Sequence, residues 1–230
     1  MPVFRLTDEL IFPPVELAEE NGLIAVGGDL SMERLILGYS LGIFPWYQDN
    51  DPILWWSPDP RFIIMLDEFK IPKSLKRILN KKEYTITLDK DFKGVITNCR
   101  KYHLSKGETW ITREMKDAYI NLHNHGLAHS VEVWKDNILV GGLYGVSLGK
   151  IFFGESMFSL EPNTSKIALV HLVSVLKEHN FILIDSQIFT RHISLMGGKN
   201  IPRKDYLILL KEAIKDGEKT TITGRWSNLL

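Results

Sequence analysis

SVEVW at Ser130–Trp134, ILVGGLYGV at Ile138–Val146 and IFFGESMF at Ile151–Phe158 are the three stretches that decide the fold. Each is rich in β-branched or aromatic residues, which favour strands over helices. Lys135-Asp136-Asn137 separates the first two and is typical of a hairpin turn, and Gly149 marks a second turn. The chain therefore has antiparallel strands at its centre. Glycines inside the middle stretch indicate a bulge or a close backbone approach.

Helical and strand patterns alternate on both sides of this centre. Ser165–Glu178 has helical spacing, with Ile167, Ala168, Leu172, Val175 and Leu176 expected to face inward. Phe181–Asp185 is a short apolar strand candidate, and Arg203–Ile214 is an amphipathic helix. Upstream, strands are expected at residues 61–66 and 84–88, and helices at residues 73–80, 91–102 and 113–125. This order predicts an α+β fold.

The first part of the chain differs in composition from the rest. Pro, Gly and Trp recur in Phe12-Pro-Pro14, Phe44-Pro-Trp46 and Trp55-Trp-Ser-Pro-Asp-Pro60, so turns should dominate. One short helix is expected at about Met32 to Leu41. We therefore predict a small N-terminal domain at residues 1–61 and a larger domain at residues 62–230.

Bulk properties indicate a cytoplasmic globular protein. The chain has 230 residues, 44% of them hydrophobic, and its single cysteine, Cys99, excludes an internal disulfide. No signal peptide is visible, and no apolar run approaches the roughly 20 residues of a membrane span. His123, His125 and His129 cluster around Gly126 without metal-ligand spacing, so we interpret that stretch as a solvated helix end.

The zero net charge hides an uneven distribution. Residues 1–60 are strongly acidic, with Arg5 and Arg34 as their only basic residues. Residues 70–106 hold eleven Lys and Arg residues against three acidic ones. Such a block could neutralise RNA phosphates, although a solvated helical surface is equally simple.

Two polar intrusions interrupt apolar strands. Glu155 lies within IFFGESMF, where a carboxylate is costly unless it has a partner or reaches a cleft. Asp185 and Gln187 follow Phe-Ile-Leu-Ile, and a continuing strand would place both side chains on one face. They could then bind one another or one ligand. Alternatively, the strand has simply reached water, and Asp185 caps a turn.

Aromatic residues crowd a short segment. Trp46, Tyr47, Trp55 and Trp56 fall in a domain too small to bury them all. Exposed aromatic rings can stack on unpaired bases. We expect most of these rings to form the core of the small domain, with one or two left for a ligand.

Several site classes lack their sequence signals. The chain has no glycine loop of the P-loop or dinucleotide-binding type. Gly154-Glu-Ser-Met-Phe158 lacks the second glycine of a nucleophile elbow, which argues against a covalent serine mechanism.

An ordered set of motifs resembles the leucyl/phenylalanyl-tRNA–protein transferase family. The set begins with Gly22–Ser31, Gly38–Trp46 and Pro52–Arg61. It continues with Thr109–Thr112, Gly141–Val146, Phe153–Phe158, Ser165-Lys166, Leu183–Gln187 and Pro202–Tyr206. Each motif alone is weak, whereas the ordered set from about Phe12 to Tyr206 is specific.

The resemblance implies both fold and activity. The larger domain should be similar to the GCN5-related acetyltransferase fold. The enzyme should move Leu or Phe, and less well Met, from aminoacyl-tRNA to proteins that start with Arg or Lys, which marks them for degradation by the N-degron route. Neither metal nor coenzyme is expected, and the enzyme should be a monomer.

The resemblance also implies roles for individual residues. Asp185 and Gln187 match the catalytic pair, and Glu155 matches an active-site carboxylate. Tyr39 and Trp46 match positions near the 3′-terminal adenosine, and Trp110 is expected at the same substrate site. The pocket for the transferred side chain is implied at Leu143, Met157, Leu172, Ile184 and Ser186. The balance between Leu and Phe stays open, because family members carry bulkier residues at Leu143 and Leu172.

This chemistry suggests a mechanism. Gln187 would hold the attacking amine, and Asp185, bonded to Gln187, would draw off the developing positive charge. Glu155 would pair with the acceptor's basic side chain or hold the adenosine ribose. We expect the tRNA backbone along Lys73, Lys76, Arg77, Lys81 and Lys82.

Two rival functions would leave different signals. An acetyl-CoA-dependent N-acetyltransferase should carry a Gln/Arg-x-x-Gly-x-Gly/Ala loop before a helix, and Gly197-Gly198-Lys199 comes too late for this. An RNA-binding module without catalysis would not need Asp185, Gln187 or a carboxylate in the apolar setting of Glu155.

Overall fold

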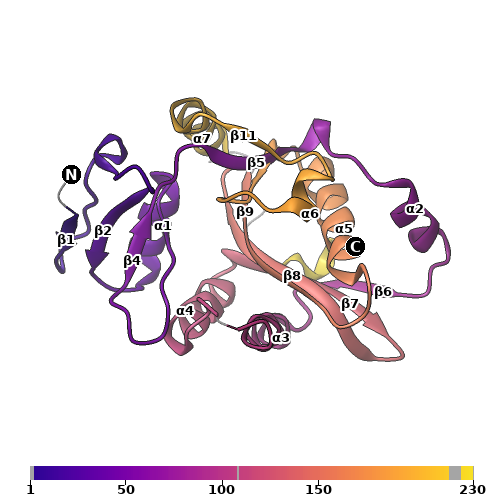
Figure 1. The fold of residues 1–230 in the computed structure, drawn as a ribbon. Coiled ribbons are helices and arrows are strands. Elements are labelled where there is room, and N and C mark those ends of the chain that lie inside the picture. The colour runs from indigo at the N-terminus through magenta and orange to yellow at the C-terminus, as the bar shows by residue number, and fades with distance from the viewer. Residues whose placement is uncertain (1–2, 108, 218–223, 230) are drawn as a thin grey trace.

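Two β-sheets from successive parts of the chain organise the fold (Figure 1). The computed structural model describes residues 3–107, 109–217 and 224–229. Within them, a four-stranded sheet has the order β1-β2-β4-β3, and a seven-stranded sheet has the order β11-β5-β10-β9-β8-β7-β6. The predicted α+β class with a small N-terminal domain is confirmed.

The small sheet comes from the Pro- and Trp-rich start of the chain. Its strands are β1 (Phe4–Leu6), β2 (Leu23–Gly27), β3 (Phe44–Pro45) and β4 (Leu54–Trp56), accompanied by η1 (Val15–Leu17) and α1 (Met32–Ser40). Helix α1 begins after Ser31, whose hydroxyl accepts a hydrogen bond from the Arg34 backbone N–H. Trp55 is fully buried and donates to the Gly27 carbonyl over 2.9 Å. The next strand already belongs to the large sheet, and a domain boundary at residue 61 stays a prediction.

The predicted antiparallel strands form the middle of the large sheet. They are β7 (Ala128–Lys135), β8 (Ile138–Leu148) and β9 (Ile151–Ser159). Asp136 and Asn137 make the hairpin turn with φ of 49° and 63°, the left-handed region that Asp and Asn tolerate. The expected bulge is present, because the β8–β9 register shifts between Tyr144 and Gly145.

Shorter strands complete the large sheet. They are β5 (Arg61–Met65), β6 (Thr85–Leu88), β10 (Leu183–Asp185) and β11 (Lys199–Ile201). Strand β10 lies between β5, to which it is antiparallel, and β9, to which it is parallel. The strand predicted at Phe181–Asp185 is therefore real but begins at Leu183.

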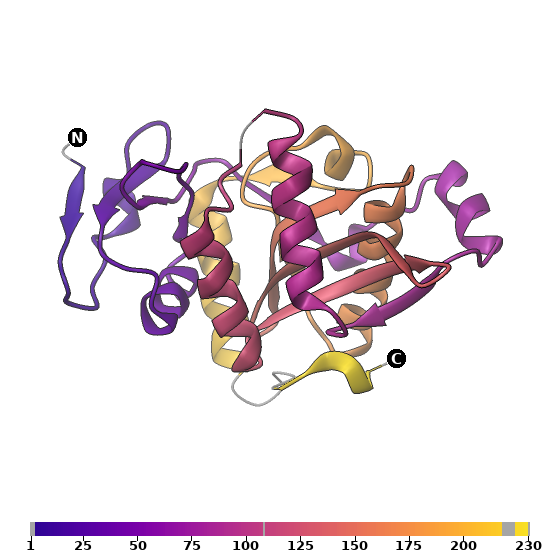
Figure 2. The ribbon, with the colours of Figure 1, turned by 90° about the horizontal axis from the view of Figure 1, so that it is seen from below.

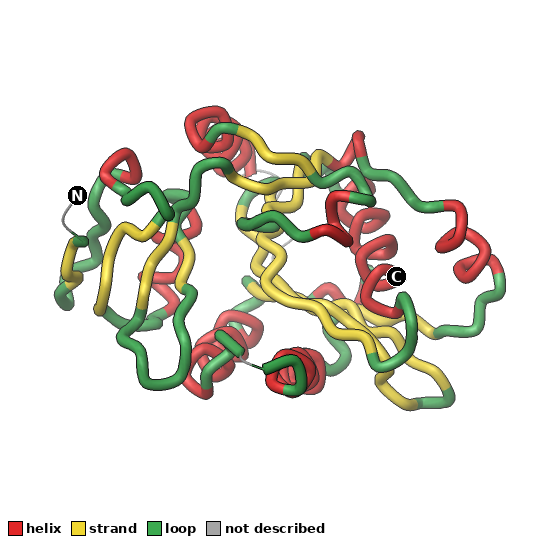
Figure 3. The backbone as a smooth tube through the Cα atoms, viewed as in Figure 1, coloured by secondary structure: helices red, strands yellow, loops and turns green. Residues whose placement is uncertain are grey.

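Helices cover both faces of the large sheet, as Figures 1, 2 and 3 show. Helices α3 (Phe92–Leu104) and α4 (Arg113–Asn124) lie on one face, and α5 (Thr164–Glu178) lies on the other. All the residues expected to face inward from α5 are buried. The remaining helices are α2 (Lys73–Asn80), α6 (Arg191–Ser194), α7 (Arg203–Gly217), η2 (Leu66–Glu68) and η3 (Trp226–Asn228). Within the described ranges, no helix is long and apolar enough to cross a membrane.

The histidines near Gly126 correct one expectation. His123 and His129 are buried rather than solvated, and only His125 of the three is exposed. His129 Nδ1 lies 2.8 Å from Asp89 Oδ2, and His123 Nδ1 lies 2.8 Å from the Ala128 carbonyl oxygen. The sequence pattern missed this because Asp89 lies 40 residues before His129.

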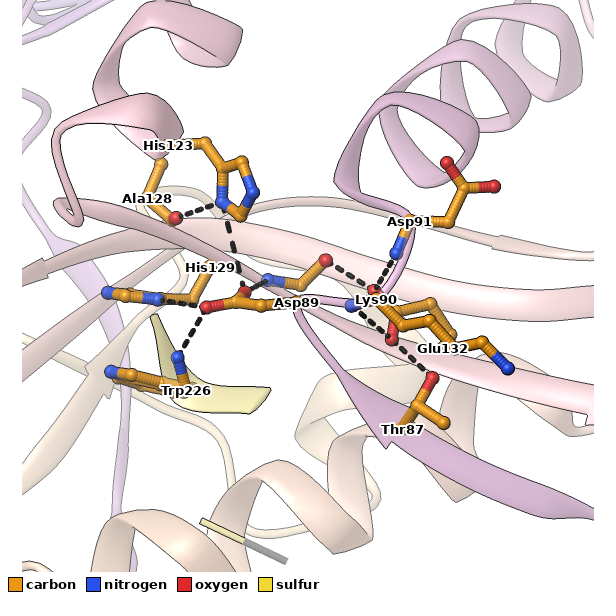
Figure 4. A network of polar contacts seen from close by, with 10 residues as sticks. Thr87, Asp89, Lys90, Asp91, His123, Ala128, His129, Glu132 and Trp226 are labelled. Carbon is orange, nitrogen blue, oxygen red and sulfur yellow. Dashed lines mark hydrogen bonds and ion pairs between the residues drawn. The ribbon is translucent and has the colours of Figure 1, made fainter. Parts of the chain in front are cut away.

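The C-terminal η3 segment closes the same network. The Trp226 ring is fully buried and stacks on His129, with ring centroids 4.0 Å apart. Its backbone N–H donates to Asp89 over 2.7 Å (Figure 4). Hydrogen bonds from His129, Trp226 and Ser130 hold the pKa of Asp89 below its usual value despite burial. Residues near the C-terminus are therefore part of the core of the large sheet.

Candidate active site

The site forms where two parallel strands separate. Strands β9 and β10 pair over Ile151–Phe153 and Leu183–Asp185 only. Beyond that point β9 continues beside β8 to Ser159, whereas β10 ends. Residues 154–159 and 186–188 line the cavity that opens between them.

The cavity has a volume of 570 Å³ and mostly apolar walls. This is a size suited to a small molecule or to part of a larger one. Helix α5 supplies one wall through Leu169 and Leu172, and strand β8 supplies another through Leu143 and Tyr144. Trp46 and Trp110 bring the N-terminal segment and the α3–α4 connection to the same cavity.

The structure brings the predicted side-chain pocket together. All five predicted residues line the cavity, although they come from three strands, a helix and a loop. They are Leu143, Met157, Leu172, Ile184 and Ser186. Apart from Ser186, these residues present apolar side chains. Their assembly gives a surface that can bury an unbranched apolar side chain.

Glu155 is the one carboxylate that lines the cavity among the described residues. Its Oε1 accepts from the Tyr39 hydroxyl over 2.7 Å and from Gln187 Nε2 over 3.0 Å. Its Oε2 accepts from the Tyr119 hydroxyl over 3.0 Å. Burial raises the pKa of Glu155 to about 7, against the opposing effect of these tyrosine hydrogen bonds.

Asp185 differs from its expected setting. Its carboxylate is fully buried and does not line the cavity. Arg61 binds it through two hydrogen bonds, Nε to Oδ1 over 2.9 Å and Nη2 to Oδ2 over 2.6 Å. The Tyr206 hydroxyl donates to Oδ2 over 2.7 Å. Burial alone would lower the pKa of Arg61, but the Asp185 carboxylate raises it, so the guanidinium stays charged.

Gln187 does not share a strand face with Asp185, as the sequence suggested. The strand ends at Asp185, and Gln187 has a φ of 56°, which turns its side chain to Glu155. Asp185 and Gln187 are nevertheless bonded, because the Gln187 backbone N–H donates to Asp185 Oδ1 over 3.0 Å. Asp185 therefore fixes the backbone of Gln187 rather than its amide group.

The aromatic cluster divides largely as expected. Trp55 and Tyr47 are buried, whereas Trp46 is 40% exposed at the cavity. The Trp46 ring packs edge-on against Trp56, and the Trp56 indole N–H donates to the Trp46 carbonyl. Tyr39 is fully buried and reaches the site only through its hydroxyl.

The predicted basic residues lie on a different surface. All five side chains are exposed and lie on α2 and the residues that follow it. They are Lys73, Lys76, Arg77, Lys81 and Lys82. Only Leu75 of this helix is buried. None of these basic residues lines the cavity, so they do not contact its contents.

The sequence analysis did not identify two residues that bind the carboxylates of the site. Tyr119 lies in the helix expected at residues 113–125 and was given no role at the site, yet its hydroxyl binds Glu155. Arg61 was interpreted only as the start of a strand. A charged residue that opens the apolar run Arg61–Met65 was the available signal for a buried acidic partner. Over the described ranges, no group of three or more His, Cys, Asp or Glu residues could hold a metal ion.

An apolar cavity beside a carboxylate and a fixed amide is the arrangement of an enzyme that transfers an acyl group. The cavity can bury the acyl side chain, and the polar pair can receive a nucleophile and its proton. The site therefore has the groups that an acyltransferase needs.

The chain belongs to the leucyl/phenylalanyl-tRNA–protein transferase family. The family model matches residues 63–211, and the model of the family's N-terminal domain matches residues 28–59. The chain is 51% identical to the leucyl/phenylalanyl-tRNA–protein transferase of Syntrophus aciditrophicus over 228 residues, which cover 99% of this chain and 94% of that protein. It is 54% identical to that of Syntrophobacter fumaroxidans over 217 residues, covering 94% and 93%. The enzyme is therefore an aminoacyltransferase.

Matches among solved structures are more distant. One is L-PGS from Bacillus licheniformis, with a TM-score of 0.41 and 12% identity over 75% of this chain and 57% of that chain. Another contains a fungal GCN5-related glucosamine N-acetyltransferase region, with a TM-score of 0.44 and 12% identity over 77% and 23%.

Proposed function

We propose that this enzyme moves Leu, Phe or Met from aminoacyl-tRNA to the N-terminal Arg or Lys of acceptor proteins in the cytoplasm. The product would enter the N-degron degradation route. The observation that carries the proposal is the apolar wall of Leu143, Met157, Leu172 and Ile184 beside Glu155 and Gln187. These three donor side chains are apolar and unbranched at Cβ, so they fit one cavity.

The reaction needs positioning more than activation of the donor. The aminoacyl ester is already reactive, whereas the acceptor must present a neutral amine, whose pKa is about 8. Gln187 Nε2 donates to Glu155, which leaves Gln187 Oε1 to accept a hydrogen bond from that amine. Asp185, which the resemblance assigned to the catalytic pair, is proposed here as a positioning residue, because it holds the Gln187 backbone. Orientation of this kind supplies a large share of the rate in acyl transfer.

One assay tests the function. Labelled Leu-tRNA and a peptide that starts with Arg should give a labelled peptide, and a peptide that starts with Glu should not. Acetyl-CoA in place of the tRNA should give no acetylated peptide. Acetylation without leucylation would contradict the proposal and favour the acetyltransferase alternative.

Trp46→Ala should weaken binding of an aminoacyl-adenosine mimic. Trp46 is exposed at the cavity, where its ring can stack on the 3′-terminal adenine. Stacking of one base on an aromatic ring contributes about 1–3 kcal/mol, so the dissociation constant should rise about 5- to 150-fold. Isothermal titration calorimetry measures this directly. The dissociation constant of Trp46→Phe should lie between those of wild type and Trp46→Ala. Equal affinities for all three proteins would show that Trp46 does not bind the base.

Charge reversal on α2 should flatten the salt dependence of tRNA binding. The triple variant Lys73→Glu, Lys76→Glu, Arg77→Glu removes up to three phosphate contacts, and each contact contributes about 0.7–0.9 to the slope of log K against log salt. The matched control reverses Lys204, Lys211 and Lys215, which are exposed on α7. An equal slope for the α2 variant and wild type would place the tRNA elsewhere.

A further inference from the structure

The Glu155 carboxylate and the hydroxyls of Tyr39 and Tyr119 contact one another pairwise, with room for one more proton. The Tyr39 and Tyr119 hydroxyl oxygens are 2.5 Å apart, and they lie 2.7 Å and 3.0 Å from the two Glu155 oxygens. Three short contacts therefore join three groups. The two hydroxyls supply only two protons, so an ionised Glu155 leaves one contact without a proton. Protonation of Glu155 supplies it.

Both oxygens of Asp185 are already occupied by hydrogen-bond donors. Arg61, Tyr206 and the Gln187 backbone N–H donate to them, and the carboxylate is fully buried. Breaking the bidentate pair would leave a buried guanidinium without a partner, which is strongly unfavourable. Asp185 therefore serves to hold Arg61 and the Gln187 backbone, and the attacking amine needs another partner.

Gln187 links the cavity to Glu155 but cannot store a proton. Its amide oxygen can accept a hydrogen bond from an amine, whereas a neutral amide is not protonated near pH 7. Its Nε2 donates to Glu155 Oε1 over 3.0 Å. An amine held by Gln187 is thus brought close to the Glu155 carboxylate.

We propose that Glu155 is the catalytic group that accepts the proton of the attacking amine, with Tyr39 and Tyr119 positioning it. The proposal rests on the aminoacyl transfer proposed above and replaces the two roles that the sequence suggested for Glu155. The amine nitrogen bonds to the ester carbonyl carbon, and the bond from that carbon to the ribose oxygen breaks. One proton moves from the nitrogen to Glu155 and then to the departing ribose oxygen. The enzyme ends in its starting state.

The surroundings of Glu155 suit this role near neutral pH. Its pKa is raised to about 7, chiefly by burial and also by Asp185, against the lowering effect of the Tyr39 and Tyr119 hydrogen bonds and of Arg61. The pKa values of Tyr39, Tyr119 and Tyr144 are all raised well above 10, chiefly by burial, so these groups remain hydroxyls. On α3, burial lowers the pKa of His103, which contacts Ser156 rather than Glu155. A proton acceptor with a pKa close to the working pH is the most effective kind.

The test is the pH dependence of single-turnover leucyl transfer at saturating substrates. The wild-type rate constant should rise through about pH 7, where Glu155 ionises, and again near pH 8, where the amine loses its proton and becomes neutral. Glu155→Gln should lose the lower step and be about 100-fold slower, within the range for loss of a general base. The step near pH 8 belongs to the substrate and should persist in every variant.

A second variant separates proton transfer from structure. Tyr119→Phe removes one hydrogen-bond partner of Glu155 and its contact with Tyr39, so the pH of the lower step should change. Tyr84→Phe is the matched control, because Tyr84 bonds to Glu161 and lies outside the cavity lining. Its profile should equal that of wild type.

The outcomes are distinct. A wild-type profile for Glu155→Gln would overturn the proposal, and so would a slower Tyr119→Phe whose lower step stays in place. Glu155 would then only position other groups. If wild type itself transfers no Leu to the Arg peptide, the proposed function fails instead. Circular dichroism on each variant checks that it is folded.

Discussion

Asp185→Asn should lower the free energy of unfolding by about 3–5 kcal/mol, which is the usual cost of removing one partner of a buried ion pair. Arg61 and Asp185 are 1% and 0% exposed, so the variant leaves a guanidinium charge with no anion and little water. The new amide can accept from Arg61 through one oxygen only. Its NH2 group would also face the Arg61 and Tyr206 donors.

A surface pair provides the control for this prediction. Lys199 and Glu68 also lie 2.6 Å apart, yet their side chains are 42% and 51% exposed. Glu68→Gln should therefore cost less than about 1 kcal/mol. Urea titrations of both variants measure the difference. Equal losses would show that burial does not make the Arg61–Asp185 pair special.

The same variant tests the positioning role of Asp185. In wild type, Asp185 Oδ1 accepts from both the Gln187 backbone N–H and Arg61 Nε. The single amide oxygen that Asp185→Asn leaves could retain one of these bonds, but not both fully. Turnover measured below the unfolding transition should fall far more than tRNA affinity. Turnover close to that of wild type would restrict Asp185 to a structural role.

Local patterns predicted the elements well but not their long-range partners. The central strands and α5 followed from periodicity, because side-chain spacing within one element is a local property. The partner of Asp185 lies 124 residues away in sequence, and that of His129 lies 40 away. Nothing in either local pattern encodes such a distance. Burial of His123 and His129 was therefore missed.

The position of Gln187 shows a second limit. The period-two argument placed it beside Asp185 because it assumed that the strand continues. The backbone instead enters the left-handed region at Gln187, which an apolar-to-polar transition in the sequence does not reveal. The residues that the family resemblance assigned to a side-chain pocket all line one cavity, and their role there stays a prediction.

Gln187→Glu should lower turnover at least about 100-fold while it changes the affinity for an aminoacyl-adenosine mimic only slightly. The substitution keeps the size of the side chain and the backbone N–H bond to Asp185. It replaces a donor, 3.0 Å from Glu155 Oε1, with a second carboxylate. Two carboxylates at this distance cannot both ionise near neutral pH, so the pair retains a proton. Glu155 then cannot receive the proton of the amine.

The stability of this variant should depend on pH in a defined direction. The shared proton raises the pKa of the pair in the folded state above its value of about 4.3 in the unfolded chain. The folded state then binds more protons, so the free energy of unfolding falls as pH rises through the raised pKa. Wild type already loses some stability in this way up to about pH 7, where Glu155 ionises, and Gln187→Glu should continue to lose it above pH 7.

Gln187→Met separates these two effects. It removes the amide without adding a charge, so it should lose turnover but show a smaller fall in stability between pH 7 and pH 8.5 than Gln187→Glu. Urea titrations at pH 5.5, 7 and 8.5 measure the fall for all three proteins. If the free energy of unfolding depends on pH in the same way for Gln187→Glu and Gln187→Met, the new carboxylate turns away from Glu155. The hydrogen bond between Gln187 and Glu155 would then not be a fixed feature of the site. Gln187 would no longer be expected to hold the amine close to Glu155.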